Sequence, residues 1–378
     1  MPVQTYSHVR VIAFRQPTVA VSSAGATLYG VPPGSVPQTR WFTFSSPHAS
    51  DLSLIPQQSD LFFRMQRFLN AMAEAQAYLE KRSLDRKNEL KIFMAPEFYF
   101  RPDNSDKAYT YDEFVAFRRI MTDTLAKDGR FKNWFVVCGS LVWKRRDDII
   151  GLRPSYSWFS GDYFYNTSVT IFLTSKGAGK SVDIDKTATS NIDGIPFTSS
   201  SDRLHHLLGR TYEQDRIIEE NGIRIGLDIC LEHIKGLRKV RSKVISEMTN
   251  NKTDVRPHIH LVTACGMPLH NGSTGSRRLG YRARVDGLLN NDENGTNVEG
   301  MQMDQVELYR FKKLDGTYNI SKVYNSKAES KIKAEVRAKK VLNIPSSHDL
   351  HLPLPAGSKS EFWDARPQKI VIYKRKSL

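Results

Sequence analysis

Cysteine is scarce in this 378-residue sequence, which has three thiols, Cys138, Cys230 and Cys265. They are too few and too scattered for a disulfide framework, and no Cys-x-x-Cys or Cys/His cluster has the spacing of a zinc site. Apolar runs are short as well: no stretch reaches about 18 apolar residues, and the first 17 residues lack the regions of a signal peptide. We therefore expect a cytoplasmic protein with no membrane span, which leaves open only export without a conventional signal.

Acidic residues are outnumbered, with 40 Asp and Glu against 55 Lys and Arg, so the formal net charge is +15. Residues 301–378 hold 16 basic and 8 acidic residues, so this last fifth of the chain carries +8 of that charge. The 40% hydrophobic content excludes a disordered or collagen-like chain and is enough for a large core. Length alone allows two or three domains or one large one.

Apolar patterning predicts strands that alternate with helices, which is typical of a layered α/β domain. Residues 59–84 and 112–127 have the three- and four-residue apolar spacing of amphipathic helices, and a further helix is predicted over 234–249. A Pro-, Gly- and Ser-rich stretch up to about residue 50 predicts a long irregular loop. The predicted strands cover residues 9–14, 89–96, 134–143, 166–174, 222–230 and 258–264.

The basic end of the chain has a different pattern. Two alternating segments flank the Asp315-Gly316 turn and predict a hairpin over 306–324. Residues 326–342 predict a helix with a solvated basic face, and 345–360 a loop. We therefore do not expect nucleic acid as a partner, because such a basic run is typical of a solvated surface.

Three polar residues follow predicted strands and could carry chemistry. Cys230 ends the strand GIRIGLDIC, Glu97 follows KIFMAP among aromatic residues, and Lys186 follows VDI. A thiolate is a nucleophile for carbonyl or nitrile carbon, a desolvated carboxylate suits a general base, and an ammonium can stabilise an oxyanion. Because ligands gather at strand ends in α/β sheets, we expect the three side chains to meet.

This arrangement resembles the nitrilase superfamily of carbon–nitrogen hydrolases, which carry a Glu-Lys-Cys triad. The similar motifs are MAPEFYF at Glu97, DIDKTAT at Lys186 and GLDICLEH at Cys230, with VVCGSLVW, YNTSVTIFL and HIHLVTACG similar to neighbouring strands of that family. The resemblance covers about residues 8–325. Many members carry a second glutamate about eight residues after the lysine, a role that passes here to Asp193 or is vacant.

The resemblance implies a four-layer αββα sandwich over residues 1–325, followed by a basic C-terminal extension over 326–378. It implies that Glu97 deprotonates Cys230, that Lys186 and the backbone N–H of Leu231 form the oxyanion hole, and that no metal or organic cofactor takes part. The substrate would be a small amide, nitrile or carbamoyl compound, and the protein a homo-oligomer. We expect the substrate pocket to be lined by the neighbours of Glu97 and Cys230, namely Phe98, Tyr99, Glu232 and His233.

Two other interpretations stay open. A catalytically idle scaffold could bind a protein or polyanion through the basic C-terminal region. A papain-like hydrolase could instead pair Cys230 with His258 or His260, although the local signature around the cysteine is missing. We expect these two histidines to be packed or solvated, because the sequence offers no carboxylate or cysteine at metal-ligand spacing from them.

Overall fold

The computed structural model describes most of residues 6–290 and shorter segments after them. The described residues are 6–15, 18–22, 25–28, 42–57, 59–102, 108–146, 162–177, 179–186, 216–233, 239–240, 242–244, 255–267, 273, 275–277, 280–290, 304–306, 309–314, 317–322, 338–344, 368–373 and 375–378. Asp193 and the loop predicted at 345–360 lie outside them, as do residues 326–337 of the predicted basic helix.

The larger sheet has ten strands within the described residues, in the order β18-β19-β1-β4-β6-β8-β7-β5, with β9 beside β8 and β20 beside β1. β1, β4 and β6 are parallel, whereas β8 runs antiparallel to β6, β7 and β9. The strands are β1 (His8–Arg15), β4 (Glu89–Met94), β5 (Tyr109–Thr110), β6 (Trp134–Val137), β7 (Leu141–Arg146), β8 (Asp162–Leu173), β9 (Gly179–Asp185), β18 (Ala338–Ile344), β19 (Gln368–Tyr373) and β20 (Lys376–Ser377).

The second sheet has five strands in the described part of the chain, in the order β10-β11-β12-β13-β15. They are β10 (Ile217–Glu220), β11 (Ile223–Ile229), β12 (Ile259–Ala264), β13 (Gly280–Asp286) and β15 (Asp304–Val306). β11, β12 and β13 are parallel. A small sheet joins β14 (Leu288–Asn290), β2 (Val19–Ser22) and β3 (Gly25–Leu28), and a hairpin joins β16 (Tyr309–Leu314) to β17 (Thr317–Lys322) around the predicted turn.

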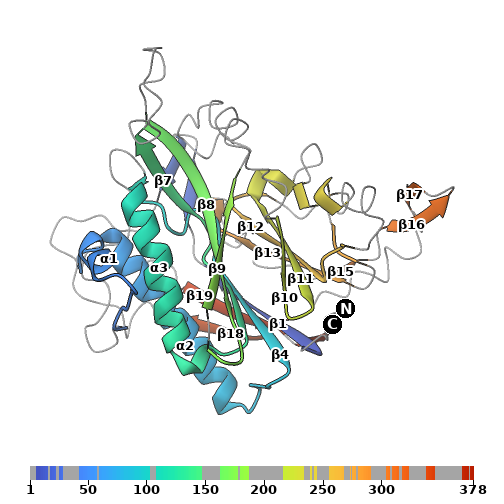
Figure 1. The fold of residues 1–378 in the computed structure, drawn as a ribbon, viewed down its shortest axis with the longest axis horizontal. Helices are drawn as coiled ribbons and strands as arrows, with labels where there is room; N and C mark the ends of the chain where they lie inside the picture. Colours follow the sequence, from blue (N-terminus) through green and yellow to red (C-terminus); the bar gives the residue numbers. More distant parts are fainter. Residues whose placement is uncertain are drawn as a thin grey trace.

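Helices α1 (Ala49–Leu54), α2 (Asp60–Lys81) and α3 (Tyr111–Lys127) cover the outer face of the larger sheet (Figure 1). Ser59 caps α2 by accepting from the Phe62 N–H, and Thr110 with Glu113 forms a capping box at the start of α3. These caps fix where the two predicted helices begin. Among the described residues, no helix is both long and apolar enough to cross a membrane.

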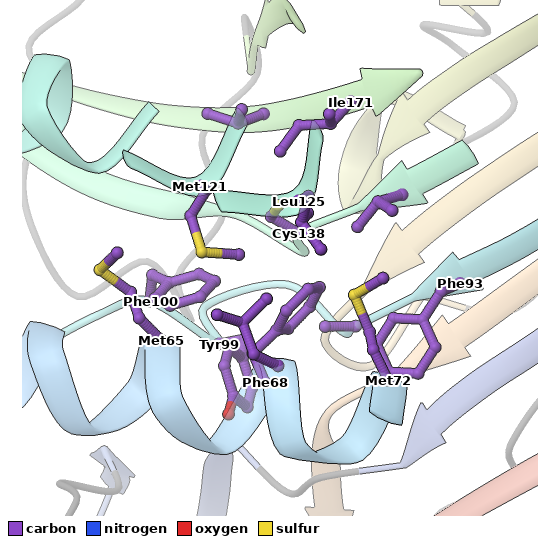
Figure 2. Packing of buried hydrophobic residues seen from close by; sticks show 14 of the residues in the cluster. Met65, Phe68, Met72, Phe93, Tyr99, Phe100, Met121, Leu125, Cys138 and Ile171 are labelled. Atoms are coloured by element: carbon purple, nitrogen blue, oxygen red, sulfur yellow. The ribbon is translucent and has the colours of Figure 1, made fainter. Parts of the chain in front are cut away.

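Apolar residues of α2 and α3 pack on the larger sheet in one cluster, which Figure 2 shows from close by. Those labelled there include Met65, Phe68 and Met72 from α2, Met121 and Leu125 from α3, and Phe93, Tyr99, Phe100, Cys138 and Ile171 from the sheet and its loops.

A second cluster fills the space between the two sheets, with Val9, Val11, Ile92, Met94 and Val137 from the larger sheet and Ile225, Leu227, Ile229, Leu261 and Val285 from the smaller one. The chain is therefore a mixed α/β fold with a helical layer and two packed sheets.

Three predicted elements differ from the structure. The strand predicted over 134–143 is two strands, β6 and β7, because Gly139 between them has a φ of 78° that breaks the extended chain. The stretch before residue 50 contains β2 and β3 rather than loop alone. Residues 338–342, predicted as the end of a helix, belong to β18, since pairing with β19 outweighs the helical preference of this Ala- and Lys-rich run.

The C-terminal segment is part of the larger sheet, although the sequence predicted a separate extension from residue 326. β19 lies antiparallel beside β1, and Ile370 and Ile372 are fully buried in the helix-facing cluster. The Leu378 N–H also donates to the Ser7 carbonyl at 3.0 Å, and β20 lies beside the start of β1. The basic tail therefore contributes core strands to the fold.

Candidate active site

Glu97 lies three residues beyond the end of β4 and is fully buried. Its backbone is fixed from two sides, because its N–H donates to the Ala264 carbonyl at 3.3 Å and its carbonyl accepts from Thr18 Oγ1 at 2.7 Å. Its side-chain Oε1 accepts from Asn166 Nδ2 at 3.0 Å and from Lys186 Nζ at 2.8 Å. The carboxylate is therefore held in one orientation by two donors on a single oxygen.

Lys186 follows the last residue of β9, and its backbone N–H donates to the Asn166 carbonyl at 2.8 Å. Its side chain is 1% exposed and reaches Glu97, with Nζ 5.6 Å from the centre of the Phe98 ring. Asn166 on β8 therefore holds both ends of this pair, since it contacts the Lys186 backbone and the Glu97 carboxylate. A buried ion pair persists only where such geometry compensates the cost of desolvation.

Cys230 begins the 3₁₀ helix Cys230–His233 directly after β11 and is 3% exposed. Its Sγ lies 3.7 Å from the Cys265 carbonyl oxygen, and the charged side chains that act on the thiol are Glu97 and Lys186. Burial raises the pKa of the Cys230 thiol well above its usual value, the charge of Glu97 raises it further, and the Lys186 ammonium opposes both. The resting group is therefore a neutral thiol that needs a base to become a nucleophile.

Backbone strain is concentrated around these residues. Cys230 has a φ of 48° and Phe98 a φ of 62°, values that side chains other than glycine rarely adopt. Phe98 is held there by the Ser140 Oγ, which accepts from its N–H at 3.0 Å. A Cβ on Gly139 would come within 2.2 Å of the Pro96 carbonyl oxygen, so the Gly139-Ser140 turn can lie against the Glu97 loop only without a side chain. Such strain persists where the surrounding contacts enforce it, and it is common at functional sites.

The structure thus brings Glu97, Lys186 and Cys230 together, as the strand-end pattern predicted. Leu231 follows Cys230 in the same 3₁₀ helix and is partly buried. Phe98 is 1% exposed, and its ring lies beside the Lys186 ammonium and 4.8 Å from the Arg101 guanidinium. A general base, a cation and a thiol in one desolvated place can support attack of sulfur on an electrophilic carbon.

Tyr99 does not line this site, contrary to the sequence-based expectation. Its ring packs against Phe14, Phe68 and Phe100 in the helix-facing cluster, and its hydroxyl donates to the Arg64 carbonyl at 3.2 Å. Cys230 belongs instead to the cluster between the two sheets. The site and Tyr99 therefore lie on opposite faces of the larger sheet.

Glu232 is also not a lining residue, because it is fully buried in an ion pair with Arg216. Both carboxylate oxygens accept from the guanidinium, and Oε2 also accepts from the Ile229 N–H at 3.0 Å. Arg216 was missed in the sequence, since it lies 16 residues from Glu232 in a long insertion without a motif. The pair fixes the turn that carries Cys230.

His233 points away from the thiol as well. Its Nδ1 lies 3.0 Å from Asp228 Oδ2, and the same oxygen lies 2.9 Å from His260 Nε2. Although burial works against it, the two histidines lower the pKa of Asp228, whereas burial lowers the pKa of His233. Asp228 also accepts from the Val240 N–H at 3.0 Å. Glu232 and His233 therefore do not line a pocket; their buried polar contacts hold the turn that carries Cys230.

Asp228, His233 and His260 place three ligand atoms within 4.8 Å of one another, so they are the described residues that could hold a metal ion. However, the Gly275 N–H donates to His260 Nδ1 at 3.1 Å, which leaves the proton on Nε2, where it faces Asp228. Hydrogen bonds thus already join Asp228 to both histidines. The expectation that His260 lacks a carboxylate partner is wrong, because alternation along β11 brings Asp228 to the same face as His260.

This geometry gives no support to the papain-like pairing. Both ring nitrogens of His260 are occupied by Asp228 and Gly275, and His258 Nδ1 accepts from the Arg224 N–H at 3.1 Å. The charged groups that act on the Cys230 thiol are Glu97 and Lys186.

No family model matches the sequence, and no curated protein gives a significant match.

Proposed function

We propose that this protein is a thiol-dependent hydrolase of a non-peptide C–N bond, acting through a covalent acyl-enzyme at Cys230. The observation that carries the proposal is the buried convergence of Glu97, Lys186 and Cys230 from three separate strand ends, with Lys186 on Glu97 at 2.8 Å. A buried ion pair next to a thiol is costly to maintain, which favours a role beyond stability.

In the proposed first step, Glu97 takes the proton of Cys230 as sulfur bonds to the amide carbon. The carbonyl π electrons move to oxygen, and that oxyanion is stabilised by the Lys186 ammonium and the backbone N–H of Leu231. When the oxyanion collapses, the C–N bond breaks and the amine leaves with the proton held by Glu97. The product at this stage is a thioester on Cys230.

In the second step, Glu97 deprotonates a water molecule, which attacks the thioester carbon. The C–S bond breaks, the acid leaves, and the proton returns from Glu97 to sulfur. The net reaction adds one water to the substrate and gives an acid and an amine or ammonia. The substrate class we propose is a small amide, with nitriles and carbamoyl compounds as the nearest relatives in chemistry.

The resemblance of the strand-end motifs to the nitrilase superfamily also leads us to propose the four-layer αββα sandwich of that family. The helical layer and the two packed sheets support it. The described residues 239–240 and 242–244 are helical and fall in the predicted helix 234–249. Val240 is fully buried, and its side chain would meet a Cβ on Gly226 of β11, so these residues cover the outer face of the second sheet. In the proposed sandwich these residues would belong to the fourth layer.

An ammonia-release screen over amides, nitriles and ureas tests the proposed reaction, with Cys230→Ala and Cys138→Ala as matched variants. Cys138 is a buried thiol of the helix-facing cluster, so its loss should leave turnover within about threefold. We expect release by the wild type and Cys138→Ala and none by Cys230→Ala. Equal release by Cys230→Ala would contradict the proposal. No release from any compound by the wild type would favour the idle scaffold.

A further inference from the structure

Arg216 joins two segments that carry the proposed site. Its Nη2 donates to the Asp185 carbonyl at 2.6 Å and to Glu232 Oε1 at 2.5 Å, while Nη1 donates to Glu232 Oε2. The Arg216 side chain is 2% exposed and that of Glu232 is fully buried. One guanidinium therefore bonds to the end of β9 and to the 3₁₀ helix after β11 at the same time.

Each of these bonds ends next to a residue of the proposed triad. Asp185 directly precedes Lys186, and the Glu232 carboxylate accepts from the N–H of Ile229, which directly precedes Cys230. A continuous path of hydrogen bonds thus connects the backbone before Lys186 with the backbone before Cys230. The Asp185 carbonyl accepts from Arg216 and the Ile229 N–H donates to Glu232, and both backbone groups lie where their strands end.

We propose that Arg216, together with Glu232, is a positioning residue that fixes the Lys186 ammonium relative to the Cys230 sulfur. This inference rests on the proposed function, because it assigns the pair a task in the same site. The planar guanidinium suits the task, since it presents several donors in a rigid fork that can bond to a carboxylate and a carbonyl together. A shift of about 1 Å in a reacting group can cost roughly a hundredfold in rate.

Removing Arg216 alone is a poor test, because it leaves the buried Glu232 carboxylate unpaired and can unfold the protein. The double variant Arg216→Met/Glu232→Gln removes both charges, and the amide oxygen of the glutamine can still accept from the Ile229 N–H. We expect this variant to be folded, with a thermal midpoint close to that of the wild type. Its kcat should nevertheless fall by about a hundredfold, with KM changed much less.

Arg216→Lys is the second variant, because it keeps the charge while a single ammonium replaces the fork. We expect a folded protein whose kcat falls by about tenfold or more. Arg118→Met is the matched control, since it removes an arginine that pairs with Asp183 at 2.6 Å on the same strand β9. That pair is partly exposed, so its loss should leave kcat within about twofold.

A purely structural role for Arg216 predicts a different outcome. In that case the double variant would recover activity together with stability, and Arg216→Lys would match the wild type once folded. Either folded variant with kcat within threefold of the wild type would overturn the inference. If the double variant does not fold, the Arg216→Lys measurement decides alone.

The rate of Cys230 alkylation by iodoacetamide separates this inference from the proposed function, because it requires no substrate. The Lys186 ammonium lowers the thiol pKa, so its displacement should slow alkylation at a fixed pH near 8. We expect the Arg216 variants to slow it severalfold, as Lys186→Met does. Slowed alkylation in a protein that hydrolyses nothing would sustain the positioning role and reject the hydrolase. Unchanged alkylation and a hydrolysis rate like that of the wild type would reject the positioning role alone.

Discussion

The ammonium of Lys186 lies 2.8 Å from Oε1 of Glu97, with both side chains almost completely buried. Asn166 donates to the same carboxylate oxygen from 3.0 Å and accepts from the Lys186 backbone, so the pair is held in place from β8. Both charges act on the Cys230 thiol, whose pKa they shift in opposite directions. The Glu97 carboxylate is suited to take a proton, and the Lys186 ammonium is suited to stabilise a developing negative charge.

Lys186→Met is expected to lower the kcat of the folded protein by some hundreds of times, and also to lower its stability, because it removes the ion-pair partner of the buried Glu97 carboxylate. An oxyanion donor is typically worth about 3 to 4 kcal/mol of transition-state stabilisation. Lys180→Met is the control from β9, the strand that precedes Lys186, since Lys180 is an exposed lysine that pairs with Glu220 at 3.4 Å. It should change turnover by less than about twofold. Similar rates for the two variants would remove Lys186 from the mechanism.

Glu97→Gln is expected to change hydrolysis and alkylation in opposite directions. The Glu97 charge raises the pKa of the Cys230 thiol, so its removal lowers that pKa and increases the thiolate fraction at any pH below it. Iodoacetamide should therefore label Cys230 faster, whereas hydrolysis, which needs the base, should be lost. Peptide mass mapping over pH 7 to 10 measures the rate of Cys230 labelling, and product release measures the rate of hydrolysis. Equal labelling rates in Glu97→Gln and the wild type would mean that the carboxylate does not act on this thiol.

Cys230 should also be labelled before the other two thiols in the wild type. Burial raises the pKa of all three thiols. Cys138 lies in the helix-facing cluster, and the negative charges of Glu97 and Asp286 raise the pKa of Cys265 further. At Cys230 the Lys186 ammonium offsets part of this increase in pKa. Mass mapping after a short exposure gives the order, and labelling of Cys138 first would contradict the account.

Much of the site could be predicted from the sequence because its residues follow apolar strands. The runs before Glu97 and Cys230 are mostly apolar, which is typical of buried parallel strands, and such strands present their ends at one edge. Phe98 and Tyr99 were harder to separate. Adjacent residues in this strained loop point to different faces of the sheet, and three consecutive aromatic residues give no indication of which one faces the helices.

The supporting residues could not be predicted, because their partners are distant and irregularly spaced. Arg216 contacts Asp185 and Glu232 across an insertion, and nothing in its neighbourhood forms a motif. The C-terminal strands were missed for a different reason. Residues 338–342 are rich in lysine and alanine and favour a helix locally, so only the pairing of β18 with β19 and of β19 with β1 determines their structure.

Ile372→Ala is expected to lower the free energy of unfolding by about 2 to 5 kcal/mol, because Ile372 is fully buried where β19 pairs with β1. Removal of residues 326–378 should for the same reason destabilise the fold. The exposed Arg375→Ala is the control and should stay within about 0.5 kcal/mol. Urea unfolding followed by circular dichroism measures both. A stable, active truncated protein would show that β18 and β19 are dispensable.

His260→Ala separates the Glu-Lys-Cys arrangement from a Cys/His pair. Because it removes a buried hydrogen bond to Asp228, we expect a loss of about 1 to 3 kcal/mol in stability. The folded protein should still retain kcat within about tenfold, since His260 does not act on Cys230. A folded His260→Ala protein without activity, beside an active Lys186→Met protein, would favour the papain-like mechanism.

The mass of the Cys230 peptide during turnover tests the central claim most directly. An ester with the acyl group of the best amide should be added and the reaction quenched in acid, because a better leaving group speeds acylation and lets the acyl-enzyme accumulate. We predict that the acyl mass is found on the peptide that contains Cys230 and is absent from Cys230→Ala, which should not turn over. An acyl mass on another residue, or turnover by Cys230→Ala at the wild-type rate, would contradict the account.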